Sequence, residues 1–574
     1  MPRKTELKRD GFTCCSAGDK NHSNFSHQIF ALGIFFESKD DHGIFKGWAL
    51  YDSNGVVDVG KTKESFIDRL HAISKNLNLK IYNEYSRDKV IIYIDNIEKI
   101  DGFFGDYVTD YFSYLTIDLE EFFEFRCYKD FNKKLKSAEE AAVYMQKLVN
   151  IVFIPEKHFY LTPNQHIRQV LKDRCLKEKS SIAKEMFPEG VYEYKRLREA
   201  LYGGICYCPL PGVTKEVPML GLDIKSAYIY GLLTQKYPMS KPEKVDPNTW
   251  EFYVNNSIEG SLGIYEITYT TASNIVHCFK DYTNEKVENL KSGTNVKVLL
   301  TLNSIDLGIL LNLPKVYIKE VVCYYLEVYT MNYLPNYVID TLIEEYINKN
   351  HIDKDKDPEE YALQKEILNG VYGNMIKKID FNYFKKKKDK AYLAPQWGIW
   401  TTSYCKQHLL GLALQVEGWM YSDTDSIYCY DTDKNRKLLD QYNFKTLGVM
   451  RDFCDRYGAD FFELCDLGSF EKEYEIIKFK ALKQKEYLFT ALEYDKKLKK
   501  TVKKIYVKAA GCNKEEMPMT DALYKLKHLP VGSRTFTFSV DGSYYEKTLI
   551  GEAARTMLIM LAKLKEEVDG DIEF

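Results

Sequence analysis

Short apolar runs and helical spacing alternate along the first third of the chain. Residues 27–36 (HQIFALGIFF) and 89–95 (KVIIYID) have the length and continuous apolar character of buried strands. Residues 137–150 open with a Ser-x-x-Glu capping box and continue with apolar positions at helical spacing. The pattern predicts a mixed α/β unit, which the stretch at 201–212, rich in Gly and Pro, separates from the rest of the chain.

The remaining pattern predicts strands and helices that carry polar residues at their ends. Residues 219–224 (MLGLDI) predict a short buried strand that ends in a carboxylate, and residues 241–335 predict a strand-rich insert. Residues 336–377 predict two helices around the charged turn at 348–360. Apolar residues on both sides of DTDS, at 423–426, predict a β-hairpin whose turn presents two carboxylates.

Composition sets the size and the expected compartment. With 574 residues, 45% of them hydrophobic, the chain has enough apolar residues for about three to four domains. No apolar run approaches the roughly 18 residues that span a bilayer, and no apolar signal segment follows the basic start. The 13 cysteines include no Cys-x-x-Cys pair, which favours reduced thiols in a cytoplasm over a disulfide framework or a zinc site.

The charge is nearly balanced overall and uneven locally. A net charge of −3 argues against a globally basic nucleic-acid binder and leaves local basic grooves open. Residues 478–508 hold eleven lysines against three acidic residues, and such lysines would neutralise phosphates without sequence preference. A solvated hairpin tip explains Lys496 to Lys504 equally well. The lysines from Lys478 to Lys485 are expected to line one face that contacts DNA.

Three aspartates form a candidate metal site. Asp423 and Asp425 stand in the predicted hairpin turn, and Asp223 ends the predicted strand. Carboxylate oxygens suit Mg²⁺, which keeps other positions for substrate phosphates. A lone DTD is usually structural, it recurs at 431–433, and its surroundings lack the Gly and Glu of an EF-hand loop. Asp223 beside the hairpin would complete a two-metal site for phosphoryl transfer.

The second predicted helix carries a polar face. Lys365, Asn369 and Tyr372 recur at spacings of four and three residues, so they share this face. The lysine would suit a triphosphate and the tyrosine a base pair. A solvated amphipathic helix is the alternative when the motif is considered alone.

Together these motifs resemble those of the family B DNA polymerases. Asp223-x-x-Ser226-x-Tyr228 is similar to motif A, Lys365-x-x-x-Asn369-x-x-Tyr372-Gly373 to motif B, and Tyr421-Ser422-Asp423-Thr424-Asp425-Ser426 to motif C. Lys485-Glu486-Tyr487 resembles the KxY motif. Chain length and the insert after motif A resemble the protein-primed branch of small phages and linear plasmids. The resemblance covers residues 196–574 well and the first third weakly.

The resemblance implies a fold of mixed class, α/β and α+β. It is a right-hand polymerase preceded by an N-terminal exonuclease-type domain like RNase H. The implied divisions are 1–195 for the exonuclease-like domain, 196–240 for the start of the palm with motif A, 241–335 for an insert like the first terminal-protein region, 336–377 for the fingers, 378–395 for a shortened second insert, 396–484 for the palm with motif C and 485–574 for the thumb.

The resemblance also implies roles for single residues. Asp223 and Asp425 would hold two Mg²⁺ ions, or Mn²⁺ in their place, with Asp423 assisting. Tyr228 would lie under the deoxyribose and exclude a 2′-hydroxyl. The nucleotide-binding residues would be Ser226, Tyr228, Lys365, Asn369 and Tyr372. The DNA-binding residues would be Gly203, Gly204, Lys480, Lys483, Lys485, Tyr487 and Lys508, although Tyr202 is displaced by one position from the family's YxGG motif.

The N-terminal domain is expected to have lost its exonuclease chemistry. Asn96 and Asp101 keep the form of the second exonuclease motif as a remnant. In the first and third motifs, Cys15, Ala17 and Leu148 stand where the family has acidic ligands. Three of the four carboxylates that would hold two metals are therefore missing.

The expected activity is template-directed DNA synthesis by two-metal phosphoryl transfer, without 3′–5′ proofreading. It would start from a terminal-protein hydroxyl during viral or plasmid replication. The implied partners are primer–template DNA, dNTPs and a terminal protein, with no membrane, in the host cytoplasm if the source is viral. The alternatives are untemplated or defence-related nucleotide addition, and a DNA-binding scaffold with a decayed site. A divergent exonuclease motif that uses Asp40 or Asp130 would restore proofreading.

Overall fold

The computed structural model contains two compact units, and each is described by itself. The first comprises residues 1–170 and 348–371, and the second residues 171–347 and 372–574. Within them, structure is described for residues 8–9, 12–13, 29–39, 42–52, 55–62, 64–66, 68–69, 72, 90–94, 114–118, 137–151, 153–154, 159–160, 163–247, 260–271, 296–313, 316–354, 356–379, 381, 384–495, 499–509, 534–540 and 543–549.

A five-stranded mixed sheet lies in the first unit. Its order is β5 (Gly55–Gly60), β4 (His42–Asp52), β3 (Ile29–Lys39), β6 (Val90–Ile94) and β7 (Tyr114–Asp118). Helix α5 (Ala138–Ile151) packs Ala138 and Ala142 against Ala49 of the sheet. The Glu140 N–H donates to Ser137 Oγ at 3.2 Å, as the capping box requires. The predicted strands and helix of this unit are confirmed within a few residues.

An eight-stranded antiparallel sheet organises the second unit. Its order is β10 (Cys206–Tyr207), β19 (Tyr421–Asp423), β20 (Ser426–Tyr430), β12 (Met219–Ile224), β21 (Phe470–Lys483), β22 (Glu486–Asp495) and β23 (Lys500–Ala509), and β11 (Thr214–Lys215) also pairs with β21. The predicted strand at 219–224 and the predicted hairpin at 423–426 are both confirmed.

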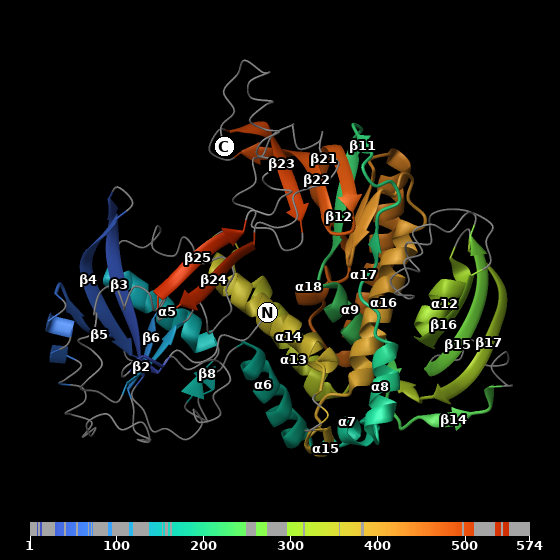
Figure 1. Cartoon of the computed structure of the whole chain (residues 1–574), viewed down its shortest axis with the longest axis horizontal. Coiled ribbons are helices and arrows are strands. Elements are labelled where there is room, and N and C mark those ends of the chain that lie inside the picture. The colour runs from blue at the N-terminus through green and yellow to red at the C-terminus, as the bar shows by residue number, and fades with distance from the viewer. Residues whose placement is uncertain are drawn as a thin grey trace. The chain divides into compact units, whose positions relative to one another are not determined.

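Three helices lie against this sheet (Figure 1): α9 (Ala227–Thr234), α16 (Pro395–Ala413) and α17 (Asp433–Tyr457). Sixteen of the 19 residues of α16 are buried and only Gln407 is exposed, so it is mainly a core helix. In α17, Thr432 accepts the Asn435 N–H as N-cap, and Gly458 ends the helix with φ 78°.

The insert forms a second, four-stranded antiparallel sheet. Its order is β14 (Glu243–Val245), β17 (Val316–Val328), β15 (Ser261–Thr271) and β16 (Val296–Asn303). The sheet curves around α12 (Ser304–Asn312), a helix that the strand-rich pattern did not predict (Figure 1). One hydrophobic cluster runs from Ile267 and Leu302 of the insert to Leu222 and Ile427 of the main sheet. The insert therefore shares the core of the second unit.

The remaining elements connect or flank these layers. The two helices predicted around the charged turn are confirmed as α13 (Asn336–Asn350) and α14 (Pro358–Ile376). The others are β1 (Lys8–Arg9), β2 (Phe12–Thr13), β8 (Phe153–Ile154), β9 (Phe159–Tyr160), α6 (Pro163–Glu178), α7 (Ile182–Met186), α8 (Val191–Glu199), β13 (Tyr237–Pro238), β18 (Met331–Asn332), α15 (Phe384–Asp389), α18 (Phe461–Leu464), β24 (Arg534–Val540) and β25 (Ser543–Leu549). Among the described helices, none combines the length and apolar character needed to cross a membrane.

A buried ion pair joins the insert to the core helix. Lys406 Nζ of α16 lies 2.7 Å from Asp306 Oδ1 of α12, and neither side chain exposes more than 2% of its surface. Ser403 Oγ donates to Asp306 Oδ2 at 2.7 Å and accepts from Asn303 Nδ2 at 2.8 Å. Asn303 also caps α12, since its Oδ1 accepts the Asp306 N–H at 2.9 Å. The two buried charges compensate each other across the boundary of the insert.

We expect Asp306→Ala to lower the free energy of unfolding by about 3–5 kcal/mol, because the Lys406 ammonium is left buried without its carboxylate. Asp306→Leu combined with Lys406→Met should recover most of that loss, because neither charge then remains buried. Urea unfolding of the wild type and the two variants measures both effects. A double variant as unstable as Asp306→Ala would contradict the explanation.

Candidate active site

Two of the three predicted metal-binding aspartates come together at joined strand ends. Asp223 lies at the end of β12, and Asp425 lies in the turn between β19 and β20. The Ile224 N–H donates to the Asp425 main-chain carbonyl oxygen at 2.9 Å. Burial first, and then the negative charges of Asp425 and Asp223, raise the pKa of Cys405 on α16. The buried thiol therefore lies within electrostatic reach of both carboxylates.

Asp423 lies one strand further along the sheet. Ser426 of β20 is the register partner of Asp423 on one side and of Asp223 on the other. Neighbouring strands are about 4.8 Å apart, so the two aspartate Cα atoms are separated by roughly 10 Å. Lys485 Nζ lies 3.3 Å from Asp423 Oδ1, and Thr424 Oγ1 donates to the same oxygen at 3.1 Å. A cation from the turn between β21 and β22 thus accompanies the third carboxylate.

The carboxylates form a pair with a flanking third member, and they are not a closed cage. Among the described residues, no group of three or more acidic, histidine or cysteine side chains is close enough to hold one ion. Mg²⁺ in phosphoryl-transfer sites commonly takes one or two protein carboxylates and completes its shell with water and substrate phosphates. The oxygen-only pair of Asp223 and Asp425 fits that chemistry.

Several residues near Asp223 and Asp425 have a strained backbone conformation. In the parts of the chain that the structure describes, five residues other than glycine have positive φ, and three of them belong to the predicted motifs. These are Ser226 (φ 52°), Thr424 (φ 63°) and Lys485 (φ 61°). Each such residue costs on the order of 1–2 kcal/mol and persists where the surrounding structure enforces it. Ser226 follows the strand of Asp223, and Thr424 separates the two aspartates of the hairpin.

The LYGG segment (residues 201–204) and the two residues that follow it contact the hairpin turn. The Thr424 N–H donates to the Ile205 carbonyl oxygen at 2.8 Å, and Cys206 pairs with Asp423. A Cβ on Gly204 would lie 2.7 Å from Thr424 Cγ2 and 2.9 Å from Thr424 Cα, closer than Cβ atoms normally approach. A Cβ on Gly203, by contrast, would meet no atom within 4 Å. Only a residue without a side chain fits at Gly204 while the turn keeps its position.

Two predicted nucleotide-binding tyrosines also come together. The rings of Tyr228 on α9 and Tyr372 on α14 stack with centroids 4.1 Å apart and an interplanar angle of 8°. The Tyr372 hydroxyl and Thr402 Oγ1 are 2.8 Å apart. Burial above all, and then the charges of neighbours that include Asp425, raise the pKa of Tyr228. The stack therefore lies within electrostatic reach of Asp425.

The other predicted nucleotide contacts lie on two different elements. Ser226 is half-buried and immediately precedes α9, which it does not cap with its side chain. Lys365 and Asn369 are exposed on α14, in the part of that helix that belongs to the first unit. Their contacts with a nucleotide stay predictions.

The predicted DNA-binding residues differ in exposure. Lys485 exposes 56% of its side chain, and Gly203 is exposed. Lys480 does not line an exposed face: it is 5% exposed, it pairs in register with Thr214 of β11, and burial lowers its pKa. The expectation that alternating lysines line one open face is therefore wrong at Lys480, and its contact with DNA stays a prediction that this burial disfavours.

The second half of the KxY motif is part of the core. Tyr487 is 7% exposed, its hydroxyl lies 3.2 Å from that of Tyr428, and burial raises its pKa to about 12. Lys508 is half-buried with its Nζ 5.9 Å from the ring centroid of Tyr474. Lys483 ends β21. Contacts of these residues with DNA stay predictions.

Helix α16 contributes to the site although no sequence motif marks it. Cys405 lies within electrostatic reach of Asp223 and Asp425, and Thr402 holds Tyr372, yet neither belongs to a motif. The available signal was a run of three hydroxyl residues, 401–403, that directly follows the apolar segment 397–400. Buried hydroxyls need hydrogen-bond partners, so such a run indicates a packed polar contact.

Comparison with known proteins identifies the kind of fold. Residues 172–395 match the model of the family described as DNA polymerase type B, organellar and viral. The structure is similar to phi29 DNA polymerase complexed with primer-template DNA and incoming nucleotide substrates, with a TM-score of 0.55, 13% identity, and 91% of this chain and 99% of that chain covered. For phi29 DNA polymerase complexed with single-stranded DNA the TM-score is 0.53 at the same identity and coverage. No curated protein sequence matches the chain. The expected multidomain fold of mixed class is confirmed.

We expect Gly204→Ala to lower the rate of nucleotide addition at least about tenfold, because the new methyl group must displace the Thr424 backbone and with it Asp425. Gly203→Ala adds the same group to the neighbouring residue, where it meets no atom within 4 Å, and should leave the turn in place. Rates on a primed template, together with DNA affinity from filter binding, separate displacement of the turn from loss of a DNA contact. Equal rate losses in the two variants would contradict the steric explanation.

Proposed function

We propose that this chain is a type B DNA polymerase, which adds deoxynucleotides to a primer 3′ end as a template strand directs. The observation that carries the proposal is the joining of the Asp223 and Asp425 strand ends beside the stacked Tyr228 and Tyr372. The phi29 polymerase structures of similar fold contain primer-template DNA and incoming nucleotides, which supports the same ligands here.

The metal site would use the carboxylates at the hairpin. Asp223 and Asp425 would hold two Mg²⁺ ions, with Mn²⁺ as the alternative ion. Bound there, the ions would supply charge stabilisation for the transferring phosphoryl group. Asp423 would assist from its place beside Lys485, whose cation limits the repulsion among three neighbouring carboxylates.

The nucleotide would be selected by its contacts with two tyrosines. Tyr228 would lie under the deoxyribose and exclude a 2′-hydroxyl, because its half-buried ring is held in a stack with Tyr372. Tyr372 would pack on the nascent base pair. Ser226 would contact the triphosphate, and Lys365, with Asn369 on the same helical face, would neutralise its outer phosphates.

The primer end would be held by the turn that carries the KxY motif. Lys485 has an exposed ammonium for the primer strand, and its N–H donates to the Tyr421 hydroxyl at 2.7 Å, which fixes the turn. Tyr487 would support this turn from the core. Lys483, Lys508 and the glycines of the LYGG segment would contact the duplex backbone, which needs no base sequence.

We further propose that synthesis begins on a terminal-protein hydroxyl, as part of viral or plasmid genome replication. The support is the insert at 241–335, which stands between motifs A and B as in the protein-primed branch. Its sheet packs into the same hydrophobic core as the main sheet. A partner bound to the insert would therefore be held in fixed relation to Asp223 and Asp425.

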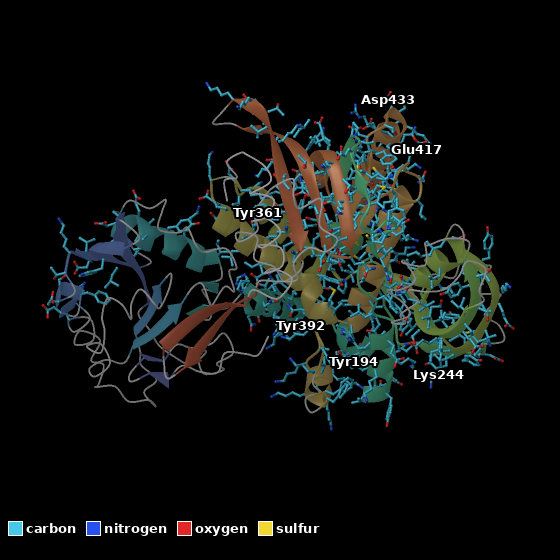
Figure 2. The ribbon with its side chains drawn as sticks, turned by 45° about the horizontal axis from the view of Figure 1, so that its top comes forward. Tyr194, Lys244, Tyr361, Tyr392, Glu417 and Asp433 are labelled. Atoms are coloured by element: carbon cyan, nitrogen blue, oxygen red, sulfur yellow. The ribbon has the colours of Figure 1, made fainter. Side chains whose placement is uncertain are left out.

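Asp223→Asn and Asp425→Asn should each reduce nucleotide addition below about a tenth of wild type while DNA binding stays nearly intact, because each removes a metal-binding charge. Asp433→Asn is the matched control. It makes the same change in the second Asp-Thr-Asp sequence, at the start of α17 near Glu417 (Figure 2), and should leave activity unchanged.

The assay supplies single labelled dNTPs and Mg²⁺ with primed templates of defined sequence. Incorporation that follows the template supports the proposal. Incorporation that ignores the template would favour untemplated addition, and full activity in Asp425→Asn would place the metal site elsewhere.

We also propose that this polymerase lacks 3′–5′ proofreading. The third exonuclease motif is expected on α5, where Lys147 and Leu148 occupy the positions around the missing aspartate. Lys147 Nζ lies 2.5 Å from Glu360 and 3.4 Å from Asp357, and the hydrogen bond to Glu360 is the largest cause that raises its pKa. A cation held in this way cannot bind Mg²⁺. Asn96, Asp101, Cys15, Ala17, Asp40 and Asp130 lie outside the described residues.

A 3′-mismatched, end-labelled primer should therefore stay at full length when it is incubated with the protein and Mg²⁺ without dNTPs. The reason is that too few carboxylates remain to hold two metals on a frayed end. Gel electrophoresis over a time course measures the primer length. Shortening that disappears in Asp101→Ala would contradict this proposal and leave the polymerase proposal untouched.

A further inference from the structure

Two residues of α8 hold the end of the helix that carries Tyr372. The Arg198 guanidinium donates to the carbonyl oxygen of Ile376, the last residue of α14. The Tyr194 hydroxyl accepts the Ile379 N–H at 3.0 Å and donates to the Lys377 carbonyl oxygen at 3.4 Å. The last carbonyl groups of a helix have no partner within it, and a cation is favoured there by the helix dipole. Tyr194 and Arg198 together therefore act as a cap for α14.

Tyr194 is itself fixed by its surroundings. It is 1% exposed, and its ring lies 5.6 Å from Phe384 and 6.4 Å from Phe381, measured between centroids. Phe187 also packs against Phe384, with ring centroids 5.6 Å apart. Figure 2 labels Tyr194 in this region, where α8 meets α15. The hydroxyl of Tyr194 is thus presented to the end of α14 from a rigid aromatic cluster.

The core helix α16 contacts the same helix end. A Cβ on Gly398 would lie 2.5 Å from Ile376 Cγ2 and 2.9 Å from Met375 Cβ, so the two helices approach as closely as a glycine permits. One turn along α16, Thr402 holds the Tyr372 hydroxyl. The end of α14 is therefore fixed by main-chain contacts from α8 and by close packing from α16.

We propose that Tyr194 and Arg198 are positioning residues for nucleotide binding, which act by keeping Tyr372 stacked on Tyr228. Neither residue touches the reacting atoms. Ile376 lies one helical turn beyond Tyr372, so a shift of the helix end is passed to that ring. The inference rests on the proposed function, since it takes Tyr372 to pack on the nascent base pair.

The experiment removes the hydrogen bonds between Tyr194 and the end of α14 without removing the packing of the Tyr194 ring. Tyr194→Phe keeps the buried ring and deletes only the hydroxyl, which leaves the Ile379 N–H without its acceptor. We expect the KM for the correct dNTP to rise roughly fivefold while kcat stays within about twofold, because binding and not the chemical step is impaired. Tyr192→Phe is the matched control: it lies on the same helix, is 87% exposed, and should leave both constants unchanged.

Arg198 gives a second, independent test. Arg198→Ala should raise the KM for dNTP by a similar or larger factor, and Arg198→Lys should recover part of the loss because an ammonium can still donate to the Ile376 carbonyl oxygen. Thermal melting of each variant measures the folded fraction. If Arg198→Ala does not fold, the KM for dNTP in Tyr194→Phe alone decides whether the proposal holds.

The outcomes separate the two proposals. An unchanged KM in folded Tyr194→Phe and Arg198→Ala, with a wild type that copies its template, would overturn the inference and leave the proposed function standing. A loss of activity that matches the loss of folded protein, again with KM unchanged, would show a purely structural role and overturn it as well. A wild type without template-directed synthesis would overturn the proposed function.

Discussion

The hydrogen bond from the Ile224 N–H to the Asp425 carbonyl oxygen is the contact on which the candidate site depends. It extends the antiparallel pairing of β12 with β20, in which Asp223 is paired with Ser426, to the turn that carries Asp425. Because side chains alternate between the two faces of a strand, a slip of one residue would turn Asp223 to the opposite face. The strand resists that slip because both of its faces are buried: Leu222 belongs to one hydrophobic cluster, and Met219 to another.

Features that local pattern determines could be predicted from the sequence, and features that depend on distant segments could not. The strand of Asp223, the hairpin turn and α14 are each specified by runs of a few residues. The burial of Lys480 is not, since alternation shows which residues share a face of a strand and says nothing about a further strand such as β11 that pairs beside it. Helix α12 was missed because a short apolar run does not distinguish a strand from a buried helix. The contact of Tyr194 with Ile379 spans 185 positions and has no local signal at all.

The insert is separate in sequence only. Its sheet and α12 share a continuous core with the main sheet, and the pair of Asp306 and Lys406 places a buried charge on each side of the junction. A hydrophobic contact tolerates small shifts, whereas a buried ion pair loses most of its compensation when the partners separate. The pair thus favours one docking position of α12 against α16, the helix that also carries Cys405 and Thr402.

The residues with left-handed backbone have a consequence for attempts to make this protein more robust. At Ser226, Thr424 and Lys485 the chain adopts a conformation that glycine or asparagine would accept more readily. Substitutions that increase thermal stability are therefore expected at these positions, because relaxing the strained backbone raises the free energy of unfolding. The same substitutions would loosen the segments that hold Asp223, Asp423 and Asp425 in place. For this fold, heat resistance is better sought on exposed helices, away from the turns where the chain is least relaxed.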